Sequence, residues 1–539
     1  MALLPLIFTI LLTSLFLLAV AFQILSRRRH RLPLPPGPKG WPLLGFLPKL
    51  GPNPHQIFHR LSKIHGPLLH LRFGVVDVVV PCSAAVAEKL LRNDMKFINR
   101  PKNSGAEHVA YNYQDIGFLP YGPRWRMQRK LCALHLFSSK ALDDFQDGRR
   151  TEFTRLVRRL AAQSVKANGN EEEAVVDISR EVAACVGNSL SLLLLGRRVF
   201  DHDRPEVEEE LRSMVMELMA LTGSFCIADF LPGLRWFDPQ GLIARMKKLN
   251  RKFDEFLNMF IAEHRAALAE TTGPLITNNA VANKDLLTVM LKLQEINVDD
   301  EEGAKLTDID IKALLMSLYA AGSDSNSILA EWALAELIRN PIILERAQAE
   351  VDSVVGRDRL VCESDLPNLP LLQAIVKETL RLHPPAPISL PRVAVEDCQV
   401  DGYLIPRGTT LLLNIWAIGR DPSVWPDEPL DFRPDRFLPG GLHEGVDLKG
   451  SSNFSLLPFG TGRRMCVGMN LGLRMLSLMT ATMVHSFDWY LPNGQNSETL
   501  DMEEKSNGLS LLRAKPLLAR PVPRLRPEAY SKLSTHTTT

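Results

Sequence analysis

The hydrophobic and polar positions of this chain repeat mostly with the period of an α-helix. Apolar residues recur three and four positions apart, which is the spacing of one face of an amphipathic helix. We therefore expect helices over Pro54–His65, Ala84–Arg92, Arg124–Leu136, Lys140–Ala162, Glu206–Leu221, Leu242–Ala267, Lys305–Ile338, Leu344–Val355, Leu369–Leu382 and Val467–His485. Short β-branched or alternating runs predict strands within Leu68–Val80, Cys398–Ile405, Thr409–Leu413 and Leu509–Leu512. The pattern predicts a mainly α fold with small β-sheets.

The first 26 residues contain a long apolar run. No charged residue occurs from Ala2 to Leu25, and about 24 residues at 1.5 Å each span a ~30 Å hydrocarbon core. A basic segment, residues 27–31, follows directly, and basic flanks stay on the cytosolic side. A cleaved signal peptide competes, because Ala19-Val20-Ala21 resembles a cleavage site, but no basic residue precedes the run. We expect residues 1–26 to form one transmembrane helix, with the remaining chain in the cytosol.

The rest of the chain reads as one large domain behind a hinge. Residues 27–39 are basic and then rich in proline, which predicts a stiff extended connection to the anchor. Residues 40–528 contain no second linker and no repeat, and the polar stretches Asn168–Glu173 and Thr271–Asn283 predict surface loops. Residues 529–539 read as a disordered polar tail.

The composition argues against several classes of function. A net charge of +2 gives no reason to expect nucleic-acid binding. The seven cysteines are scattered and form no C-x-x-C pair, which disfavours a zinc site or a disulfide framework and indicates a reducing compartment. Gly460-Thr461-Gly462 lacks the third glycine of a dinucleotide site, so we expect electrons to come from a separate protein.

The segment Phe459–Gly468 carries the most specific chemistry. Phe, Gly, Arg and Gly stand at positions −7, −4, −2 and +2 from Cys466, a frame expected by chance with a probability of roughly 10⁻⁴. Glycines allow the backbone to approach a ligated sulfur, and a guanidinium such as that of Arg464 suits a haem propionate. A buried inert cysteine is the alternative. We predict that Cys466 is the axial ligand of a haem iron, a ligand that favours O–O cleavage.

Together with four further motifs, this segment makes the chain resemble the haem-thiolate monooxygenases, or cytochromes P-450, from about Pro33 to Arg526. The motifs occur in the family's order: Trp125-Arg-Met-Gln-Arg129, Ala321-Gly-Ser-Asp-Ser325, Glu378-Thr-Leu-Arg381 and Phe432-Arg-Pro-Asp-Arg-Phe437. The resemblance implies the cytochrome P-450 fold, one haem b, dioxygen as co-substrate, and an endoplasmic-reticulum membrane location. It also implies electrons from NADPH through a separate haemoprotein reductase, for which the candidate contacts are Arg124, Arg126, Lys130 and Arg463.

The resemblance assigns roles to individual residues. It implies that haem is held by Trp125, Arg129, Arg392, Phe459, Arg464, Cys466 and Gly468. It also implies a buried structural triad of Glu378, Arg381 and Arg436, in which the ionic groups must satisfy one another. The alternative for Glu378 and Arg381 is an ordinary surface pair three residues apart.

Small residues interrupt the expected central helix at Ala320–Gly322. A mid-helix glycine costs about 1 kcal/mol relative to alanine, so we expect either haem or a tightly packed second helix against it. Asp324 and Ser325 follow, an acid beside a hydroxyl, which is the arrangement expected for proton delivery to dioxygen. The family usually has threonine where this chain has Ser325. Because serine has a freer χ1, we expect a less well-oriented hydroxyl.

Within the family, Ala110–Phe145, Asp421–Asp447 and Leu471–Gly494 look like plant flavonoid 3'-hydroxylases. This implies hydroxylation of the flavonoid B ring. Ser510 stands where 3'-hydroxylases tend to carry threonine, so 3',5'-hydroxylation or another phenylpropanoid substrate stays open. A dioxygen-independent isomerase or dehydratase and a non-enzymatic, membrane-tethered haem protein are the remaining alternatives.

Overall fold

The structure is a computed structural model that describes residues 32–166, 174–200, 205–271, 285–296, 305–451 and 453–531. The predicted anchor (1–26), the basic half of the hinge and the loop Asn168–Glu173 lie outside these residues. So does the predicted loop Thr271–Asn283, except for Thr271. Within the predicted tail, residues 529–531 are helical, with Ala529 buried and Tyr530 partly buried. They belong to α18 (Pro527–Ser531), where the Tyr530 hydroxyl donates to the Ser486 carbonyl, so the prediction of disorder is wrong there.

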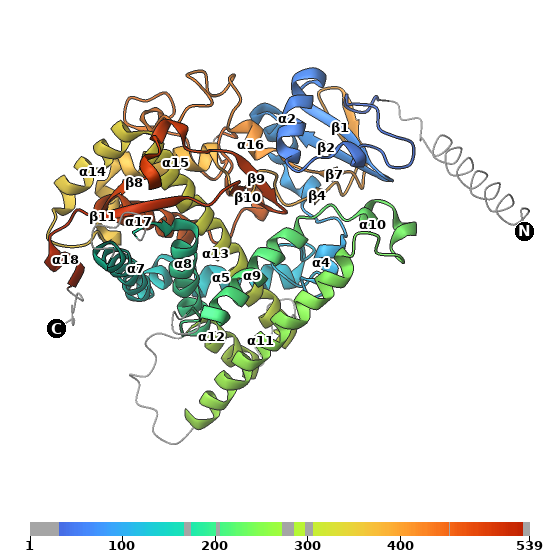
Figure 1. The fold of residues 1–539 in the computed structure, drawn as a ribbon. Coiled ribbons are helices and arrows are strands. Elements are labelled where there is room, and N and C mark those ends of the chain that lie inside the picture. Colours follow the sequence, from blue (N-terminus) through green and yellow to red (C-terminus); the bar gives the residue numbers. More distant parts are fainter. Residues whose placement is uncertain are drawn as a thin grey trace, which may run out of the picture.

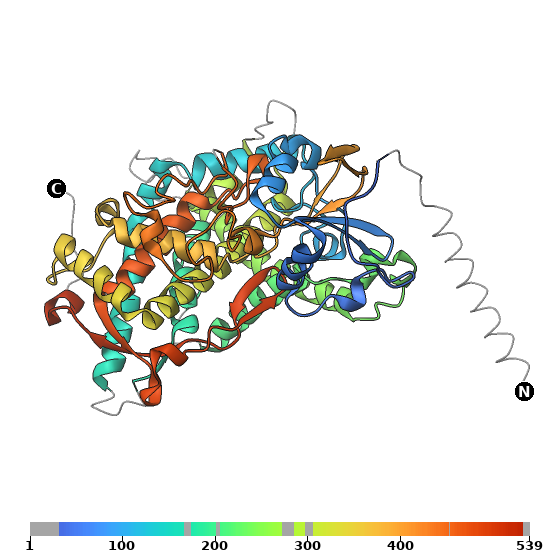
Figure 2. The same ribbon diagram turned by 90° about the horizontal axis from the view of Figure 1, so that it is seen from above.

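Helices gather on one side of the molecule around α13 (Asp308–Arg339), and the largest sheet lies on the other (Figures 1 and 2). The longer helices are α2 (Pro54–His65), α5 (Pro123–His135), α7 (Gln146–Lys166), α8 (Ile178–Leu195), α9 (Pro205–Thr222), α11 (Leu242–Thr271), α12 (Leu286–Glu295), α14 (Pro341–Val355), α15 (Pro370–Leu382) and α17 (Met469–Ser486). The shorter ones are α3 (Ala84–Leu91), α4 (Ser104–His108), α6 (Ser139–Asp144), α10 (Ile227–Phe230) and α16 (Ile415–Ile418).

The start and end of α13 follow from its sequence. The Thr307 hydroxyl accepts from the Asp310 N–H and the Asp310 carboxylate accepts from the Thr307 N–H, a reciprocal cap that fixes the first turn. Pro341 prevents continuation beyond Asn340, because the residue before proline avoids the helical region. Between these ends α13 packs against α8, α9, α15, α17 and β10 (Ser510–Arg513), so its middle lies in the core.

The strands form four small sheets. Antiparallel β1 (Leu68–Phe73) and β2 (Val76–Pro81) continue through β7 (Thr410–Leu411), parallel to β2, to β4 (Arg392–Val393). The other sheets are the hairpin β5 (Cys398–Val400) with β6 (Tyr403–Ile405), the hairpin β9 (Glu504–Asn507) with β10, and the three strands β3 (Val176–Asp177), β11 (Leu518–Pro523) and β8 (Phe487–Tyr490). The prediction of a mainly α fold with small sheets is confirmed.

Several predicted elements have different boundaries. The helix expected over Lys140–Ala162 is two helices, α6 and α7, separated at Phe145. The strand regions Leu68–Val80 and Cys398–Ile405 are each a hairpin, because Gly74 and Gly402 have positive φ and turn the chain. Helices α8 and α12 were not predicted. The α8 sequence is apolar on almost every face and mostly buried, so it lacks the polar stripe that identifies a surface helix.

Two described stretches are long and apolar enough to cross a membrane by length and composition alone, Ile178–Leu195 and Glu208–Phe230. The first is α8, which is largely buried between α7 and α13 and therefore belongs to the core. Neither stretch bears on the predicted N-terminal anchor, which lies outside the described residues.

Candidate haem site

The loop before α17 is held in one conformation by backbone contacts. The Cys466 N–H donates to the Phe459 carbonyl at 2.9 Å. Gly462 has a φ of +69°, and a Cβ there would lie 2.5 Å from the Asp94 carboxylate, so only glycine fits. Asp94 also accepts from the Arg463 N–H and guanidinium, at 2.6 Å each. The glycine of the motif thus brings the loop onto an acid far away in the sequence.

The Cys466 thiol is both enclosed and accessible. Burial raises its pKa, against the opposing effects of a backbone hydrogen bond from Gly468 and the charge of Arg129. The side chain nevertheless keeps exposed surface, as does Ala321 in the middle of the buried helix α13. A side chain that the protein surrounds and that still has accessible surface borders an internal space. The thiol is therefore available to a ligand inside the protein.

Basic side chains predicted to contact haem propionates gather beside this loop. Arg129 and Arg392 donate to carbonyl oxygens of the Cys466 loop at 2.8 Å each. The Arg464 guanidinium lies 4.7 Å from the centre of the Trp125 ring, and that of Arg129 lies 5.2 Å from it. These four residues come from α5, β4 and the loop itself, so the structure brings together predicted positions from three segments that are distant in sequence.

This cluster contains buried donors without acceptors. Trp125 Nε1, Arg392 Nη1 and Arg464 Nη1 have no hydrogen-bond partner in the described structure. Burial lowers the pKa values of Arg392 and Arg464 to about 10, and for Arg464 the charges of Arg392 and Arg129 act in the same direction. Unpaired buried donors and unbalanced positive charge are costly, and an anionic ligand would relieve both. The two propionates of a haem would fit this requirement.

Sequence reasoning missed one member of the cluster, Arg100. Its side chain donates to the carbonyls of Gly117 and Leu390 at 2.9 Å each. Burial and the charges of Arg392 and Arg464 hold its pKa well below the ordinary value. In the sequence, Arg100 only follows the apolar pair Phe97-Ile98 by two positions. No motif spacing connects it with the other site residues.

The central helix corrects one part of the interpretation. A Cβ at Gly322 would lie 2.9 Å from Leu190 on α8, so this glycine accommodates a neighbouring helix and not haem. The small residues were expected to face either haem or a tightly packed second helix, and for Gly322 the second explanation applies. The accessible residue at this level of α13 is Ala321.

Asp324 and Ser325 are neighbours in sequence but have different partners. The Ser325 hydroxyl donates to the Ala321 carbonyl at 2.7 Å, one turn earlier in α13. The Asp324 carboxylate accepts from the hydroxyl of Ser510 on β10. Burial raises the pKa of Asp324 to about 6, and the hydrogen bond from Ser510 acts in the opposite direction. A carboxyl with this pKa exchanges protons near neutral pH.

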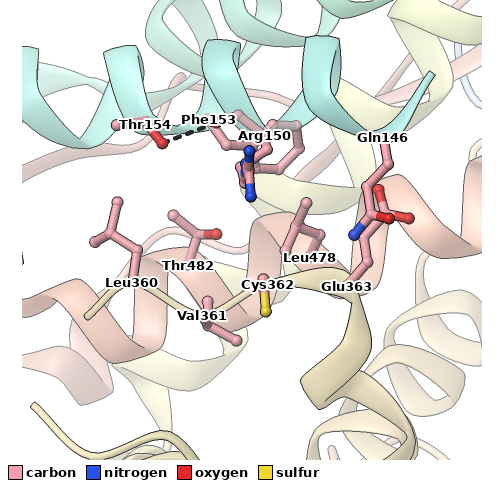
Figure 3. Close-up of a pocket in the computed structure, with 10 residues that line it drawn as sticks. All are labelled: Gln146, Arg150, Phe153, Thr154, Leu360, Val361, Cys362, Glu363, Leu478 and Thr482. Atoms are coloured by element: carbon pink, nitrogen blue, oxygen red, sulfur yellow. Dashed lines mark hydrogen bonds between the residues drawn. The ribbon is translucent and has the colours of Figure 1, made fainter. Parts of the chain in front are cut away.

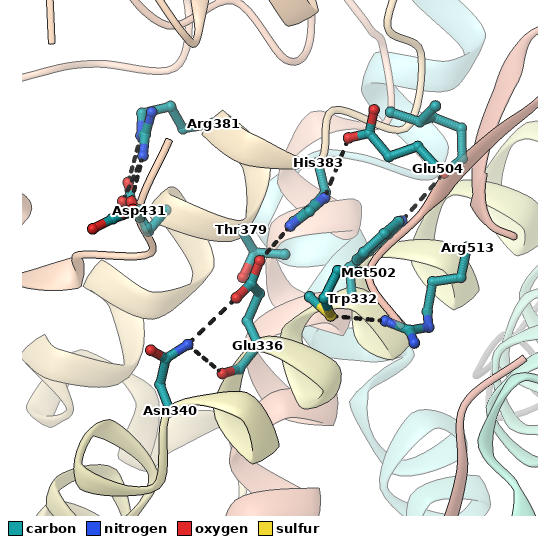
Figure 4. Close-up of polar contacts among 12 residues, drawn as sticks. Trp332, Glu336, Asn340, Thr379, Arg381, His383, Asp431, Met502, Glu504 and Arg513 are labelled. Atoms are coloured by element: carbon teal, nitrogen blue, oxygen red, sulfur yellow. Dashed lines mark hydrogen bonds and ion pairs between the residues drawn. The ribbon is translucent and has the colours of Figure 1, made fainter. Parts of the chain in front are cut away.

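Glu378, Arg381 and Arg436 lie together in the interior. Arg381 makes two hydrogen bonds of 2.7 Å to the Glu378 carboxylate, and Arg436 donates to the same carboxylate at 3.1 Å. Arg381 also donates to backbone carbonyls of the segment before Arg436, including that of Asp431 at 3.0 Å (Figure 4). The group therefore connects α15 to the segment that carries Pro434–Phe437.

A small pocket lies away from these residues, among α7, α17 and the segment around Cys362 (Figure 3). Its lining includes Arg150, Phe153, Leu360 and Thr482. None of the predicted site residues lines it, so it is not part of the haem site.

The family model "Cytochrome P-450" matches residues 35–519, and the chain therefore belongs to the cytochrome P-450 family, the haem-thiolate monooxygenases. A flavonoid 3'-monooxygenase of Oryza sativa subsp. japonica is 54% identical over 93% of both chains. A flavonoid 3'-monooxygenase of Petunia hybrida is 51% identical over 96% of this chain and 97% of its own. A zebra fish cytochrome P-450 solved with progesterone is 26% identical, with a TM-score of 0.69 over 87% of this chain and 99% of its own. The predicted fold, enzyme class and haem cofactor are confirmed.

Proposed function

We propose that this protein hydroxylates the 3' position of the flavonoid B ring in flavonoid biosynthesis, using NADPH and dioxygen. The proposal rests on one observation, the 48–54% identity over nearly the whole chain to proteins named flavonoid 3'-monooxygenase. A flavonoid 3',5'-hydroxylase of Crocosmia x crocosmiiflora is also 48% identical, over 94% of both chains. Together with Ser510, this makes 3',5'-hydroxylation the second candidate.

In this proposal the enzyme's own residues hold the cofactor. Cys466 would be the thiolate ligand of the iron, and Trp125, Arg129, Arg392 and Arg464 would bind the propionates. The support is the unpaired buried donors of Trp125, Arg392 and Arg464. Phe459 and Gly468 shape the loop: the Phe459 carbonyl accepts from the Cys466 N–H, and the Gly468 N–H donates a hydrogen bond to the Cys466 side chain. The bound haem supplies the chemistry of dioxygen activation. Asp324 and Ser325 of α13 would supply protons for this chemistry.

Electrons reach the site from an NADPH-dependent haemoprotein reductase. Of the basic residues predicted to contact it, Arg126 and Lys130 are exposed on α5. Arg124 hydrogen-bonds to Gln114, and Arg463 is paired with Asp94. We place the reductase on the α5 side of the Cys466 loop, where positive charge would meet an acidic partner.

The proposed location is the endoplasmic-reticulum membrane, with residues 1–26 as a single transmembrane helix and the catalytic domain in the cytosol. The support is the apolar run followed by the arginines of residues 27–31. Residues 27–39 would act as the hinge between the lipid and the domain of residues 40–528.

The test is incubation of microsomes containing the protein and a plant reductase with NADPH and a panel of flavanones. We expect a flavanone with only a 4'-hydroxyl on its B ring to give the 3',4'-dihydroxy product. A 3',4',5'-trihydroxy product would assign the second candidate function. NADPH-dependent conversion of a different phenylpropanoid, with all flavanones untouched, would contradict both, and a haem protein that consumes no NADPH would be non-enzymatic.

A further inference from the structure

The hairpin β9–β10 brings one hydroxyl against the central helix. In its register Ser510 stands opposite Asn507, directly after the turn at Gly508-Leu509. The Leu509 N–H donates to the Met219 carbonyl at 3.2 Å, and a Cβ at Gly508 would lie 2.3 Å from the same oxygen. The tip of the hairpin is thus seated on the end of α9. This seating places Ser510 beside α13.

Ser510 is 2% exposed, and its hydroxyl donates to Oδ2 of Asp324. Within the part of the chain that the structure describes, this is the only hydrogen bond of the Asp324 side chain, and Asp324 takes part in no ion pair. Asp324 keeps part of its surface accessible although the protein encloses it, as Cys466 does. The carboxylate therefore borders the interior space with one hydroxyl as its hydrogen-bond partner.

No charged side chain among the described residues perturbs Asp324. The only influences on its pKa are burial and the hydrogen bond from Ser510. Charged groups on the helices and the strand packed against α13 have partners elsewhere, among them Arg180 and Glu181 on α8, Glu210 and Glu217 on α9, Lys377, Glu378 and Arg381 on α15, Arg474 and His485 on α17, and Arg513 on β10. On α13 itself, Lys312 pairs with Asp254 and Glu331 lies near Arg513.

The base of the same hairpin is fixed by buried charge, and Figure 4 shows one of these contacts, between Glu504 and His383. The Glu504 carboxylate accepts from Trp416 Nε1 at 2.9 Å and from Arg420 at 3.1 Å. Burial would raise its pKa, but hydrogen bonding from His55 and the charges of Arg420 and His383 lower it to about 2. Glu504 therefore stays ionised throughout the neutral range, and the start of β9 keeps its anchor.

The middle of the hairpin is attached to α13 as well. Trp332 Nε1 donates to the Leu511 carbonyl at 3.3 Å, and the Leu511 N–H donates to the Pro385 carbonyl at 2.9 Å. The Trp332 ring in turn stacks on the His383 ring, with the two ring centres 3.9 Å apart, and His383 is hydrogen-bonded to the Glu336 carboxylate at 2.7 Å. Because Leu511 is adjacent to Ser510, these contacts hold the hydroxyl in place before any ligand binds.

We propose that Ser510 is the positioning residue of Asp324: its hydroxyl, fixed by the anchored hairpin, orients the carboxylate and favours its ionised form, and so controls proton delivery. This inference rests on the proposed role of Asp324 in oxygen activation. It gives the C-terminal hairpin a part in the chemistry. Ser510 does not itself need to touch the reacting atoms.

The first test is an infrared titration of the holoenzyme, following the C=O stretch of protonated Asp324, identified as the band missing in Asp324→Asn. In the wild type we expect the Asp324 carboxyl to titrate near pH 6. Ser510→Ala removes a hydrogen bond to a charged group, so its midpoint should rise by about one pH unit. Ser510→Thr retains the hydroxyl and should titrate close to wild type. Ser506→Ala removes a hydroxyl from β9 that contacts His55 and not Asp324, and should leave the midpoint unchanged.

The second test measures product formed per NADPH consumed in the same variants, after haem content has verified folding. Ser510→Ala should lower this ratio by about tenfold at neutral pH, and threonine should restore it. In the Asp324→Asn background, Ser510→Ala should have almost no further effect, because residues that act through one another are not additive.

An unchanged midpoint in Ser510→Ala, or a full additional loss in the Asp324→Asn background, would overturn the inference. The latter result would place Ser510 in substrate contact instead. Failure of the proposed function is distinguishable: wild type would then form no hydroxylated flavonoid, while the infrared midpoints would still report whether Ser510 controls Asp324.

Discussion

Glu378→Gln is expected to yield little or no folded haem protein. The substitution keeps the shape of the side chain but leaves the buried guanidiniums of Arg381 and Arg436 without their carboxylate. Breaking a buried ion pair from one side typically costs about 3–5 kcal/mol, a large part of a total stability of roughly 5–15 kcal/mol. The measurements are haem content after expression and the midpoint of thermal unfolding.

The matched control is Glu209→Gln. Glu209 and Arg212 have the same spacing of three residues, but Glu209 is exposed and its distance to Arg212 is 3.7 Å. An exposed pair of this kind contributes about 0–1 kcal/mol, so the control should fold and bind haem like wild type. Equal stability of the two variants would show that the buried triad does not hold the structure.

Arg464→Gln should fold but release haem faster than wild type. Arg464 carries one of the three unpaired buried donors beside Cys466, and glutamine provides neither its charge nor its planar fork. A lost hydrogen bond between charged groups is worth about 1.5–3 kcal/mol, which corresponds to roughly 10–100-fold in haem dissociation. The rate is measured by transfer of haem to an excess of apomyoglobin.

Arg526→Gln is the control for this experiment, because Arg526 forms an exposed ion pair with Asp358. It should leave the rate of haem transfer unchanged. If Arg464→Gln lost haem no faster than Arg526→Gln, the basic cluster would not be the propionate site.

Local patterns in the sequence located most of the elements that surround the site. The helix over Pro54–His65 has the predicted limits, because proline begins it and Gly66 follows its last residue. Helix α8 could not be found in this way, since a helix that is buried on nearly all faces shows no polar stripe. The elements with the clearest sequence signal are those that face water on one side.

The contacts within the site depend on tertiary structure that no local pattern encodes. Ser510 and Asp324 are 186 positions apart and meet only because the hairpin tip is seated on α9. Arg100 is held in the basic cluster by the hydrogen bonds that it donates to the carbonyls of Gly117 and Leu390, the second of which lies far away in the sequence. Motif spacing identified Cys466 and the Glu378–Arg381 pair, whereas Arg392 came only from the family resemblance and Arg100 from the structure.

The central claim is that the Cys466 thiolate is the ligand of the haem. It is tested most directly by the absorption spectrum of the reduced, carbon-monoxide-treated protein, in which a thiolate ligand shifts the Soret band to longer wavelength. Wild type and Cys132→Ala should show the shifted band, since Cys132 is a fully buried thiol whose pKa burial raises to about 12. Cys466→Ala should lack it. An unchanged shifted band in Cys466→Ala would contradict the account.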